Sequence, residues 1–396
     1  HAHPEAGWTE FRTAALIIRR LRELGYAIRM GEAACASDRR MGVPSSAVLA
    51  AARERALEHG ADAELVAGMG DGYTGFWADL DCGPGPVTAF RFDMDCNEVA
   101  ECAEESHRPM REGFASRWPG LMHACGHDGH AAVGLGLAEV LVSIRRHLRG
   151  RIRLIFQPAE EGARGALPMS EAGAVDGVDV LFGFHIGFKA EGPGSLICGT
   201  QGFLATTKRD VLFSGVPAHA GAAPEEGKDA LLAACSAVVN LHAISRNGKG
   251  GTRIAVGRLE GGEARNVIPA SARLFMETRG ETTELDAYMT AESERILRAS
   301  ADLWGCACEW RTVGNSAGGG SSPELARLIA TVAEAMGGWK TVIPMSGFGA
   351  TEDFACLMSR VQASGGLASY LQVGTDRAAG HHSDRFDFDE TCLGRA

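Results

Sequence analysis

Short apolar runs that alternate with helical segments constrain the fold of this chain more than any other feature of its sequence. The runs Val87–Phe92, Ile152–Phe156 and Val180–Phe184 are rich in apolar residues, and a helical pattern over Ala131–Arg146 separates the first two. Strands that are apolar on both faces belong to sheets covered by helices on both sides. The pattern therefore predicts an α/β domain built on a mostly parallel sheet.

From about residue 205 the order of the predicted elements changes. Strands and helices then follow one another as β-α-β-β-α-β, at residues 208–214, 229–244, 252–259, 271–279, 283–303 and 308–313. This is the order of a ferredoxin-like α+β unit, which can close as a small domain of its own. We therefore predict a larger domain, residues 1–204 and 315–396, interrupted by a smaller domain at residues 205–314.

The composition excludes several classes of protein. The chain has 396 residues, 45% of them hydrophobic, with 39 Lys and Arg against 50 Asp and Glu and a net charge of −11. This balance argues against nucleic-acid binding, which needs a clustered basic surface. No apolar run reaches the roughly 18 residues of a membrane span. Eleven cysteines without any Cys-x-x-Cys pair favour reduced thiols, so we expect a soluble, cytoplasmic protein with neither a nucleic-acid nor a membrane partner.

The densest group of candidate metal ligands lies at residues 123–130, His-Ala-Cys-Gly-His-Asp-Gly-His. Cys and His are the usual ligands of zinc and related divalent ions. A loop could turn Cys125 and His127 toward one metal, whereas His123 and His130 suit supporting positions or the start of the following helix. The alternative is a polar turn that contains these histidines by coincidence.

Further candidates follow two other predicted strands or lie near the C-terminus: Glu160, Glu161, His185, His381 and His382. Open parallel sheets bind their ligands at the carboxyl ends of the strands. Cys, His, Glu, His and His from four segments exceed what one tetrahedral zinc needs, and they fit two metal ions about 3.5–4 Å apart. Each residue also has an ordinary structural interpretation, since exposed Glu often begin a helix and a single His after a strand often only completes a core.

A serine hydrolase is an alternative function. Gly314-Asn-Ser316-Ala-Gly318 matches the G-x-S-x-G pattern and follows a predicted strand. That motif requires a tight turn from strand to helix, whereas residues 318–323 delay the next helix. Labelling of Ser316 by a fluorophosphonate probe would support this alternative. A nucleotide-binding module fits less well, because the chain has no Walker A sequence and no G-x-G-x-x-G after a strand.

Seven motifs are spread over almost the whole chain: His3-Pro-Glu5, Arg91-Phe-Asp-Met-Asp95, His123-Ala-Cys-Gly-His-Asp128, Pro158-Ala-Glu-Glu-Gly162, Asn266-Val-Ile-Pro269, Glu352-Asp-Phe354 and His382-Ser383. In these motifs and in their order the sequence resembles the dinuclear metallo-amidohydrolases of the aminoacylase/carboxypeptidase superfamily. The resemblance implies a mostly parallel α/β catalytic domain with an inserted ferredoxin-like lid, or dimerisation, domain. It also implies hydrolysis of a linear amide with two divalent metal ions, Mn or Zn.

The resemblance assigns roles to single residues of the larger domain. Five positions match the family's metal ligands: Cys125, His127, Glu161, His185 and His382. Glu160 matches its general base.

Three positions of the smaller domain also match. His219 matches a lid histidine that steadies the oxyanion in the active site of the partner subunit, and Asn266 and Arg279 match residues that hold the substrate's carboxylate. Without the resemblance, a loop His, a turn Asn and a surface ion pair would be the preferred interpretations.

For the substrate, the resemblance implies p-aminobenzoyl-glutamate, with other N-acyl amino acids or dipeptides as the alternative. It implies a homodimer or a heterodimer with a homologous B subunit. A non-catalytic chain that only supports a partner is the remaining alternative, which co-expression with a homologous second chain would test.

The sequence departs from the family's pattern in places. Cys96-Asn97-Glu98 stands where Ala-Leu-Pro is usual, and Thr351 stands in place of Ser. Neither change removes a ligand, but the first lies near the metal motif. The resemblance also leads us to expect segments before His1 and after Ala396.

Overall fold

The structure is a computed structural model that describes residues 1–396, and these divide into two units. The larger unit comprises His1–Gly202 and Gly320–Ala396, and the smaller unit comprises Phe203–Gly319. The sequence analysis predicts these divisions after residues 204 and 314, whereas the units of the structure are divided after Gly202 and Gly319.

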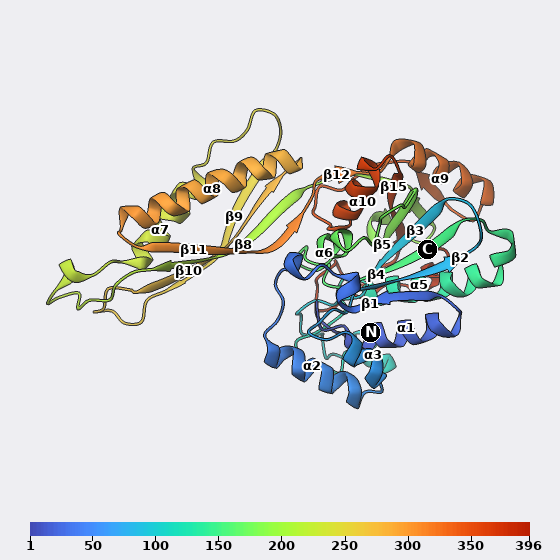
Figure 1. The fold of residues 1–396 in the computed structure, drawn as a ribbon, viewed down its shortest axis with the longest axis horizontal. Coiled ribbons are helices and arrows are strands. Elements are labelled where there is room, and N and C mark those ends of the chain that lie inside the picture. Colours follow the sequence, from blue (N-terminus) through green and yellow to red (C-terminus); the bar gives the residue numbers. More distant parts are fainter. The chain divides into compact units, whose positions relative to one another are not determined.

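An eight-stranded sheet forms the centre of the larger unit, in the order β1-β2-β4-β3-β5-β15-β6-β13 (Figure 1). Its strands are β1 (Ala27–Met30), β2 (Phe76–Asp81), β3 (Val87–Asp93), β4 (Arg151–Gln157), β5 (Val180–Glu191), β6 (Ser195–Ile197), β13 (Thr341–Ile343) and β15 (Leu367–Thr375). β3 runs parallel to β4 and β5, and β15 runs parallel to β5, whereas β1, β2 and β4 pair antiparallel. The predicted α/β class with a mainly parallel sheet is confirmed.

Eight α-helices belong to the larger unit: α1 (Phe11–Glu23), α2 (Ser46–Glu58), α3 (Ala63–Gly68), α4 (Arg108–Glu112), α5 (His127–Ser143), α6 (Ala166–Glu171), α9 (Pro323–Met336) and α10 (Phe354–Ala363). A small second sheet, in the order β12-β7-β14, contains β7 (Thr200–Phe203), β12 (Gly319–Gly320) and β14 (Ser346–Gly347). None of the helices combines the length and the apolar character needed to cross a membrane.

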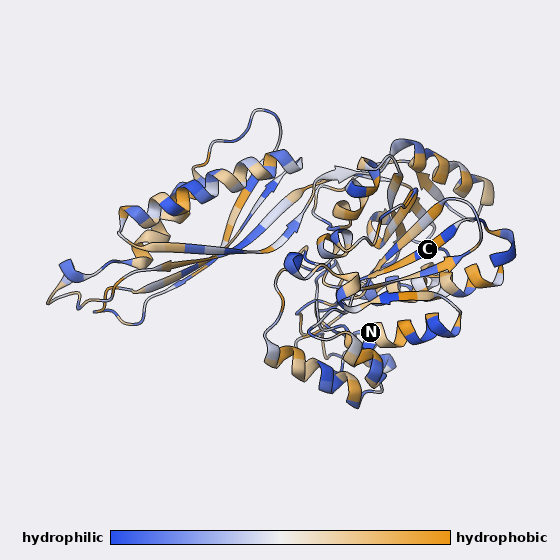
Figure 2. Cartoon of the chain, in the orientation of Figure 1, coloured by the Kyte–Doolittle hydropathy of each residue, from blue (hydrophilic) through white to orange (hydrophobic).

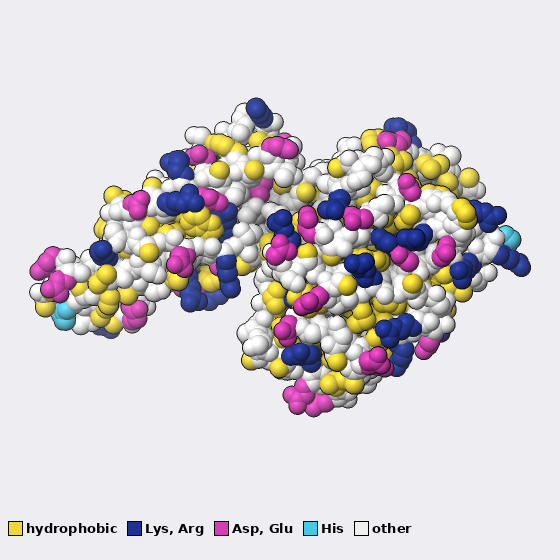
Figure 3. Space-filling view, in the orientation of Figure 1, with side chains coloured by type: hydrophobic (Ala, Val, Ile, Leu, Met, Phe, Trp, Pro, Cys, Tyr) yellow, Lys and Arg dark blue, Asp and Glu magenta, His cyan; other side chains and the backbone are white.

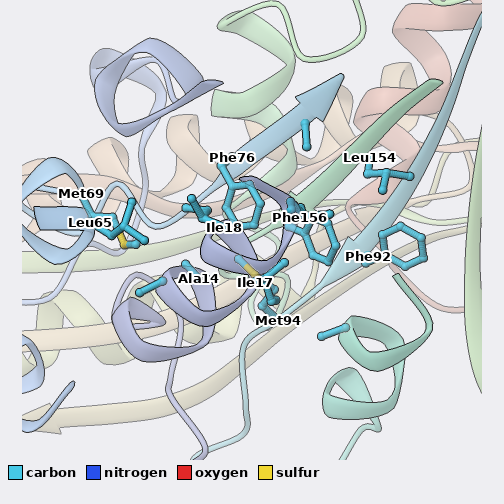
Figure 4. Close-up of a cluster of buried hydrophobic side chains, with 14 of the residues drawn as sticks. Ala14, Ile17, Ile18, Leu65, Met69, Phe76, Phe92, Met94, Leu154 and Phe156 are labelled. Carbon is cyan, nitrogen blue, oxygen red and sulfur yellow. The ribbon is translucent and has the colours of Figure 1, made fainter. Parts of the chain in front are cut away.

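The core of the larger unit lies between α1 and the sheet. α1 buries Ala14, Ile17 and Ile18 at helical spacing, and the ring of Phe76 stacks on that of Phe156 with 5.0 Å between the ring centres (Figure 4). Hydrophobic and hydrophilic residues alternate along such helices because only one face is buried (Figure 2). This packing holds the strands whose carboxyl ends carry the candidate ligands.

The smaller unit has the predicted β-α-β-β-α-β order: β8 (Ala205–Ser214), α7 (Ala230–His242), β9 (Thr252–Gly261), β10 (Ser271–Gly280), α8 (Thr283–Leu303) and β11 (Ala307–Ser316). Its antiparallel sheet has the order β11-β8-β10-β9. Val211, Phe213 and Leu274 face α7 and α8 in a separate core. Both helices cover the same face of the sheet, so the other face is left open (Figure 1).

Two elements differ from the sequence prediction at the candidate site. α5 begins at His127, four residues before the predicted start at Ala131, because Gly126 has a φ of +87° and turns the chain directly into the helix. β5 continues to Glu191, so His185 lies within a strand and does not follow it. Both differences bring candidate ligands onto regular elements.

Candidate metal centre

Cys125 and His127 flank Gly126 at the start of α5, and both side chains are buried. His127 Nδ1 lies 2.9 Å from the carbonyl oxygen of Asp95 and 3.2 Å from its Oδ1. Since a carbonyl oxygen only accepts, Nδ1 carries the proton and donates it. His127 Nε2 is buried without a partner, which leaves it available to a metal ion.

Asp95 ties His127 to the two adjacent glutamates. Its Oδ1 accepts the backbone N–H of Glu160 at 3.1 Å, and its Oδ2 accepts the backbone N–H of Glu161 at 2.9 Å. Ala159, just before them, has a φ of +49°, a conformation that a residue with a side chain adopts only when its surroundings enforce it. The turn after β4 is therefore shaped around the Asp95 carboxylate.

His185 approaches the same place from β5. Its Nδ1 donates to the carbonyl oxygen of Ile186 at 2.8 Å, and its Nε2 lies 3.4 Å from Cys125 Sγ. The Nε2 lone pair of His185 therefore faces the thiol, as two ligands of one metal ion would.

The loop that carries His381 and His382 is bound to the cysteine loop. The backbone N–H of His382 donates to the carbonyl oxygen of Ala124 at 2.7 Å, and His382 has a φ of +65°. Its Nε2 lies 3.3 Å from Glu161 Oε1. This strained residue thus places its imidazole beside a candidate carboxylate ligand.

Hydrogen bonding distinguishes the histidines that could bind a metal ion from those that could not. In four groups of side chains the ligand atoms lie within 4.8 Å of one another. His381 belongs to one of these groups and His130 to another. His381 accepts from Arg377 Nη1 at 2.9 Å and donates to Ile186 at 3.1 Å. His130 donates to Asp93 at 2.5 Å and accepts the backbone N–H of Ile186 at 3.0 Å. Both rings therefore have no nitrogen left for a metal ion.

A buried arginine pairs with carboxylates next to the candidate metal ligands. Arg91 is 1% exposed and contacts the carboxylates of Asp93, Glu352 and Asp353 at 2.5, 3.0 and 3.3 Å. It also donates to Gln157 at the end of β4. Glu160, Glu352 and Asp353 form another of the groups of candidate ligands. Because Arg91 already pairs with Glu352 and Asp353, these two carboxylates are less suited to a metal ion.

The two adjacent glutamates are in different electrostatic environments. Burial, together with the charges of Glu352, Glu161 and Asp353, holds the pKa of Glu160 well above its usual value. Burial also raises the pKa of Glu161, but the hydrogen bond to His382 and the charge of His127 outweigh it, so its pKa is lowered. Glu160 is therefore suited to hold a proton and Glu161 to remain ionised.

The donor set fits divalent metal ions. A thiol, imidazoles and carboxylates converge, and the buried Nε2 of His127 has no hydrogen-bond partner. Such unpaired buried atoms are costly unless a ligand completes them. The residues that would hold metal are Cys125, His127, Glu161, His185 and His382. Cys125 Sγ lies against His185 Nε2, Glu161 Oε1 lies against His382 Nε2, and His127 Nε2 has no hydrogen-bond partner.

The remaining predicted residues lie in the smaller unit. His219 Nδ1 accepts the backbone N–H groups of Gly221 and Ala222 at 3.1 Å, which orients the ring and leaves Nε2 without a partner. Asn266 is exposed, and its carbonyl oxygen accepts the backbone N–H of Ala220. Arg279 donates to Glu277 at 2.8 Å.

Sequence reasoning missed two residues at the centre. Asp95 was recognised only as part of a motif, although two carboxylates at the end of a strand, Asp93 and Asp95, signal a polar site. The side-chain amide of Asn97 hydrogen bonds to Glu161, and its Oδ1 is buried without a partner. Asn97 is one of the residues that depart from the family's pattern.

Ser316 does not meet the backbone requirement of the G-x-S-x-G motif. It ends β11, and the next α-helix begins only at Pro323. The tight strand-to-helix turn that the G-x-S-x-G motif requires is therefore absent.

Comparison with known proteins identifies relatives along the whole chain. Residues 89–395 match the model of peptidase family M20/M25/M40. The chain is 45% identical to indole-3-acetyl-aspartic acid hydrolase of Enterobacter agglomerans over 99% of this chain and 90% of that protein. Identity and coverage are the same for the A subunit of p-aminobenzoyl-glutamate hydrolase of Escherichia coli K12.

Solved structures agree with these matches. An aminobenzoyl-glutamate utilization protein from Klebsiella pneumoniae superposes with a TM-score of 0.83 at 40% identity, covering 94% of this chain and 88% of that one. A dinuclear metal binding peptidase of the M20 family from Bacillus subtilis superposes with a TM-score of 0.65 at 25% identity, covering 100% and 91%.

Replacing Asp95 with Asn should weaken metal binding about 10- to 100-fold, the usual effect of losing a residue that orients metal ligands. An amide presents an NH₂ group where the carboxylate now accepts a backbone N–H, so one bond to His127, Glu160 or Glu161 must be lost. Calorimetric titration of chelator-treated protein with Zn²⁺ or Mn²⁺ measures the effect. Asp79→Asn, which breaks an ion pair with Arg153 in the same sheet, is the matched control. Equal affinities of the two variants would contradict this role of Asp95.

Metal binding should release at least about two protons, because ligands must be deprotonated to bind. Burial raises the pKa of the Cys125 thiol to about 12. Burial lowers the pKa of His127, but the charge of Asp93 and the hydrogen bond to Asp95 outweigh it and hold this pKa well above its usual value. Both groups are therefore protonated at neutral pH without metal, and the affinity for metal should rise with pH. Calorimetry in buffers of different ionisation enthalpy counts the protons, and release of fewer than one would contradict the assignment.

Proposed function

The chain belongs to peptidase family M20/M25/M40, whose members are metal-dependent amidohydrolases and peptidases, and from this premise we propose that it hydrolyses the amide bond of p-aminobenzoyl-glutamate to p-aminobenzoate and glutamate. The observation that carries the proposal is the convergence of Cys125, His127, Glu161, His185 and His382 beside Glu160, whose pKa is held above its usual value by burial and neighbouring carboxylates. The identity to the A subunit of the E. coli hydrolase supports this substrate.

A second candidate substrate is indole-3-acetyl-aspartate. The chain is as similar to the hydrolase of that compound as it is to the E. coli protein, with 45% identity in both cases. The two substrates share an aromatic acyl group and an acidic amino acid. Other N-acyl amino acids and dipeptides are further alternatives within the same reaction class.

Cys125, His127, Glu161, His185 and His382 would hold two divalent ions, Mn or Zn. The mixed thiolate, imidazole and carboxylate donors accept either metal. When bound, the ions supply Lewis-acid polarisation of the amide carbonyl and lower the pKa of water from near 16 toward about 7.

Glu160 is the general base and then the general acid. Its carboxylate accepts a proton from the attacking water and passes that proton to the nitrogen of the leaving amino acid. Its raised pKa favours the protonated form that the second transfer needs, and Asp95 positions it through its backbone N–H. Near a bound cation the carboxylate of Glu160 would be ionised when it accepts the proton.

Residues of the smaller unit complete the reaction. His219 steadies the oxyanion in the active site of the partner subunit through its free Nε2, and Asn266 and Arg279 hold the carboxylate of the amino acid. The enzyme then acts in the cytoplasm as a homodimer or as a heterodimer with a homologous B subunit. The ordered ring of His219, held by two backbone N–H groups, supports its assignment.

Metal-restored hydrolysis tests the proposed function. Protein stripped with chelator and given Mn²⁺ or Zn²⁺ is assayed with p-aminobenzoyl-glutamate, indole-3-acetyl-aspartate, hippurate and acetyl-amino acids. We expect p-aminobenzoate release well above the rates with the other compounds. Faster cleavage of another compound would replace the substrate assignment, and absence of any cleavage by the protein with and without a co-expressed B subunit would contradict the function.

Glu160→Gln should lower turnover at least about 100-fold, the usual contribution of a general base, and leave metal content unchanged. Elemental analysis and initial rates measure the two effects. Glu58→Gln, an exposed substitution at the end of α2, is the control that should keep full activity. Near-normal turnover of Glu160→Gln would remove Glu160 from the mechanism.

A further inference from the structure

Glu10, the residue before α1, carries a carboxylate that is buried without a cation. On the face of the larger unit that Figure 3 displays, acidic and basic side chains are interspersed over the surface. Glu10 is 0% exposed, and no lysine or arginine pairs with it. A glutamate in such surroundings is costly unless hydrogen bonds compensate for the lost water. Its hydrogen-bond partners therefore indicate its role.

The side chain of Glu10 does not cap the helix that it precedes. Glu10 occupies the N-cap position of α1, yet it accepts no hydrogen bond from that helix. Glu5 caps α1 in its place, because its Oε1 and Oε2 accept the backbone N–H groups of Arg12 and Thr13 at 2.9 and 2.8 Å. The first turn of α1 is thus satisfied without Glu10, whose side chain points elsewhere.

Glu10 binds the turn that carries the two adjacent glutamates of the candidate site. Its Oε1 accepts the backbone N–H of Ala159 at 2.8 Å, and its Oε2 accepts the hydroxyl of Thr74 at 2.6 Å. Ala159 has the φ of +49° and directly precedes Glu160. Asp95 accepts the next two N–H groups of the chain. Two buried carboxylates therefore hold three successive N–H groups of this turn.

The segment before α1 also packs against Ala159. A Cβ atom added to Gly7 would lie 2.9 Å from Ala159 Cα, so the two backbones are in close contact. The next residue, Trp8, is fully buried and has a φ of +69°. Residues keep such strained conformations only where their surroundings enforce them. The contact with Gly7 and the hydrogen bond to Glu10 both restrain Ala159.

We propose that Glu10 is a positioning residue for the general base, because its hydrogen bond to the N–H of Ala159 holds the turn in the conformation that presents the Glu160 carboxylate to the attacking water. The inference rests on the proposed function for the role of Glu160, and it adds a residue that has no assigned role.

The hydrogen bond of Glu10, and not its charge, is what positions the turn. Burial and the charge of Asp95 raise the pKa of Glu10 to about 8. Much of this carboxyl group is therefore protonated at neutral pH. The neutral group still has an oxygen that accepts the N–H of Ala159, so an amide of the same shape can replace it.

Hydrogen exchange of the intact protein tests this contact without turnover. In Glu10→Met the N–H of Ala159 loses its acceptor, so we expect this amide to exchange at least about tenfold faster. Glu10→Gln should retain slow exchange, because its carbonyl oxygen can accept from Ala159 while its NH₂ group donates to the Thr74 hydroxyl. Mass spectrometry of fragmented peptides resolves this amide. Unchanged exchange in Glu10→Met would overturn the proposal.

Turnover measures the effect on the reaction, with p-aminobenzoyl-glutamate or indole-3-acetyl-aspartate as substrate and metal at saturation. Glu10→Met should lower kcat about 10- to 100-fold, the effect of a small displacement of a reacting group. KM should stay nearly unchanged, because an interaction that acts only in the transition state does not alter substrate binding. Glu10→Gln should retain kcat. Glu10→Asp keeps the charge but is too short for both partners, so it should behave like Glu10→Met and replaces that variant if it does not fold.

Glu5→Met is the matched control. It removes another buried carboxylate from the same segment, one that binds two N–H groups of α1 and none of the turn. It should lower the melting temperature as Glu10→Met does, but leave kcat and the exchange of Ala159 unchanged.

The outcomes separate this inference from the proposed function. Equal loss of turnover in Glu5→Met and Glu10→Met, or full turnover of Glu10→Met, would refute the positioning role and leave the hydrolase function standing. Absence of cleavage by the unchanged enzyme would refute the hydrolase function, and the exchange of Ala159 would still decide whether Glu10 holds the turn.

Discussion

The buried charge of Arg91 is the interaction on which the candidate site depends. Its guanidinium contacts three carboxylates and joins β3 to the end of β4 and to the residues that precede α10. Removing one partner from a buried ion pair typically costs about 3–5 kcal/mol, because the other charge is left uncompensated. The network therefore keeps the carboxyl ends of these strands together, and every candidate ligand of the larger unit is attached to this end of the sheet.

Acidic residues connect Arg91 to the imidazoles of the candidate site through hydrogen bonds. Asp93 is shared between Arg91 and His130, and His130 in turn accepts a backbone N–H from β5. Asp95, two residues later, orients His127 and the turn with Glu160. The imidazole nitrogens that contact Asp93, Asp95 or the backbone are used in hydrogen bonds. The other imidazole nitrogens point to the place where metal would bind.

The two units have different proposed roles. The larger unit has the converging candidate ligands and Glu160, the proposed general base. The smaller unit has a core of its own and contains His219, Asn266 and Arg279, the residues proposed to contact the substrate. An inserted domain can change its surface without disturbing the strands next to the candidate metal ligands, because the two units have separate cores.

The sequence by itself determined the α/β class, the β-α-β-β-α-β insert and the residue types of the candidate site, because apolar periodicity and short motifs are local properties of the chain. Tertiary structure alone decided which side chains are free to act. Adjacent His381 and His382 look equivalent in the sequence, yet Arg377 and Ile186 occupy both nitrogens of His381. Likewise, the opposition of Arg253 to Arg279 exists only in the register of β9 and β10. Hydrogen-bond partners and strand register join residues far apart in the chain, and for that physical reason no local pattern could reveal them.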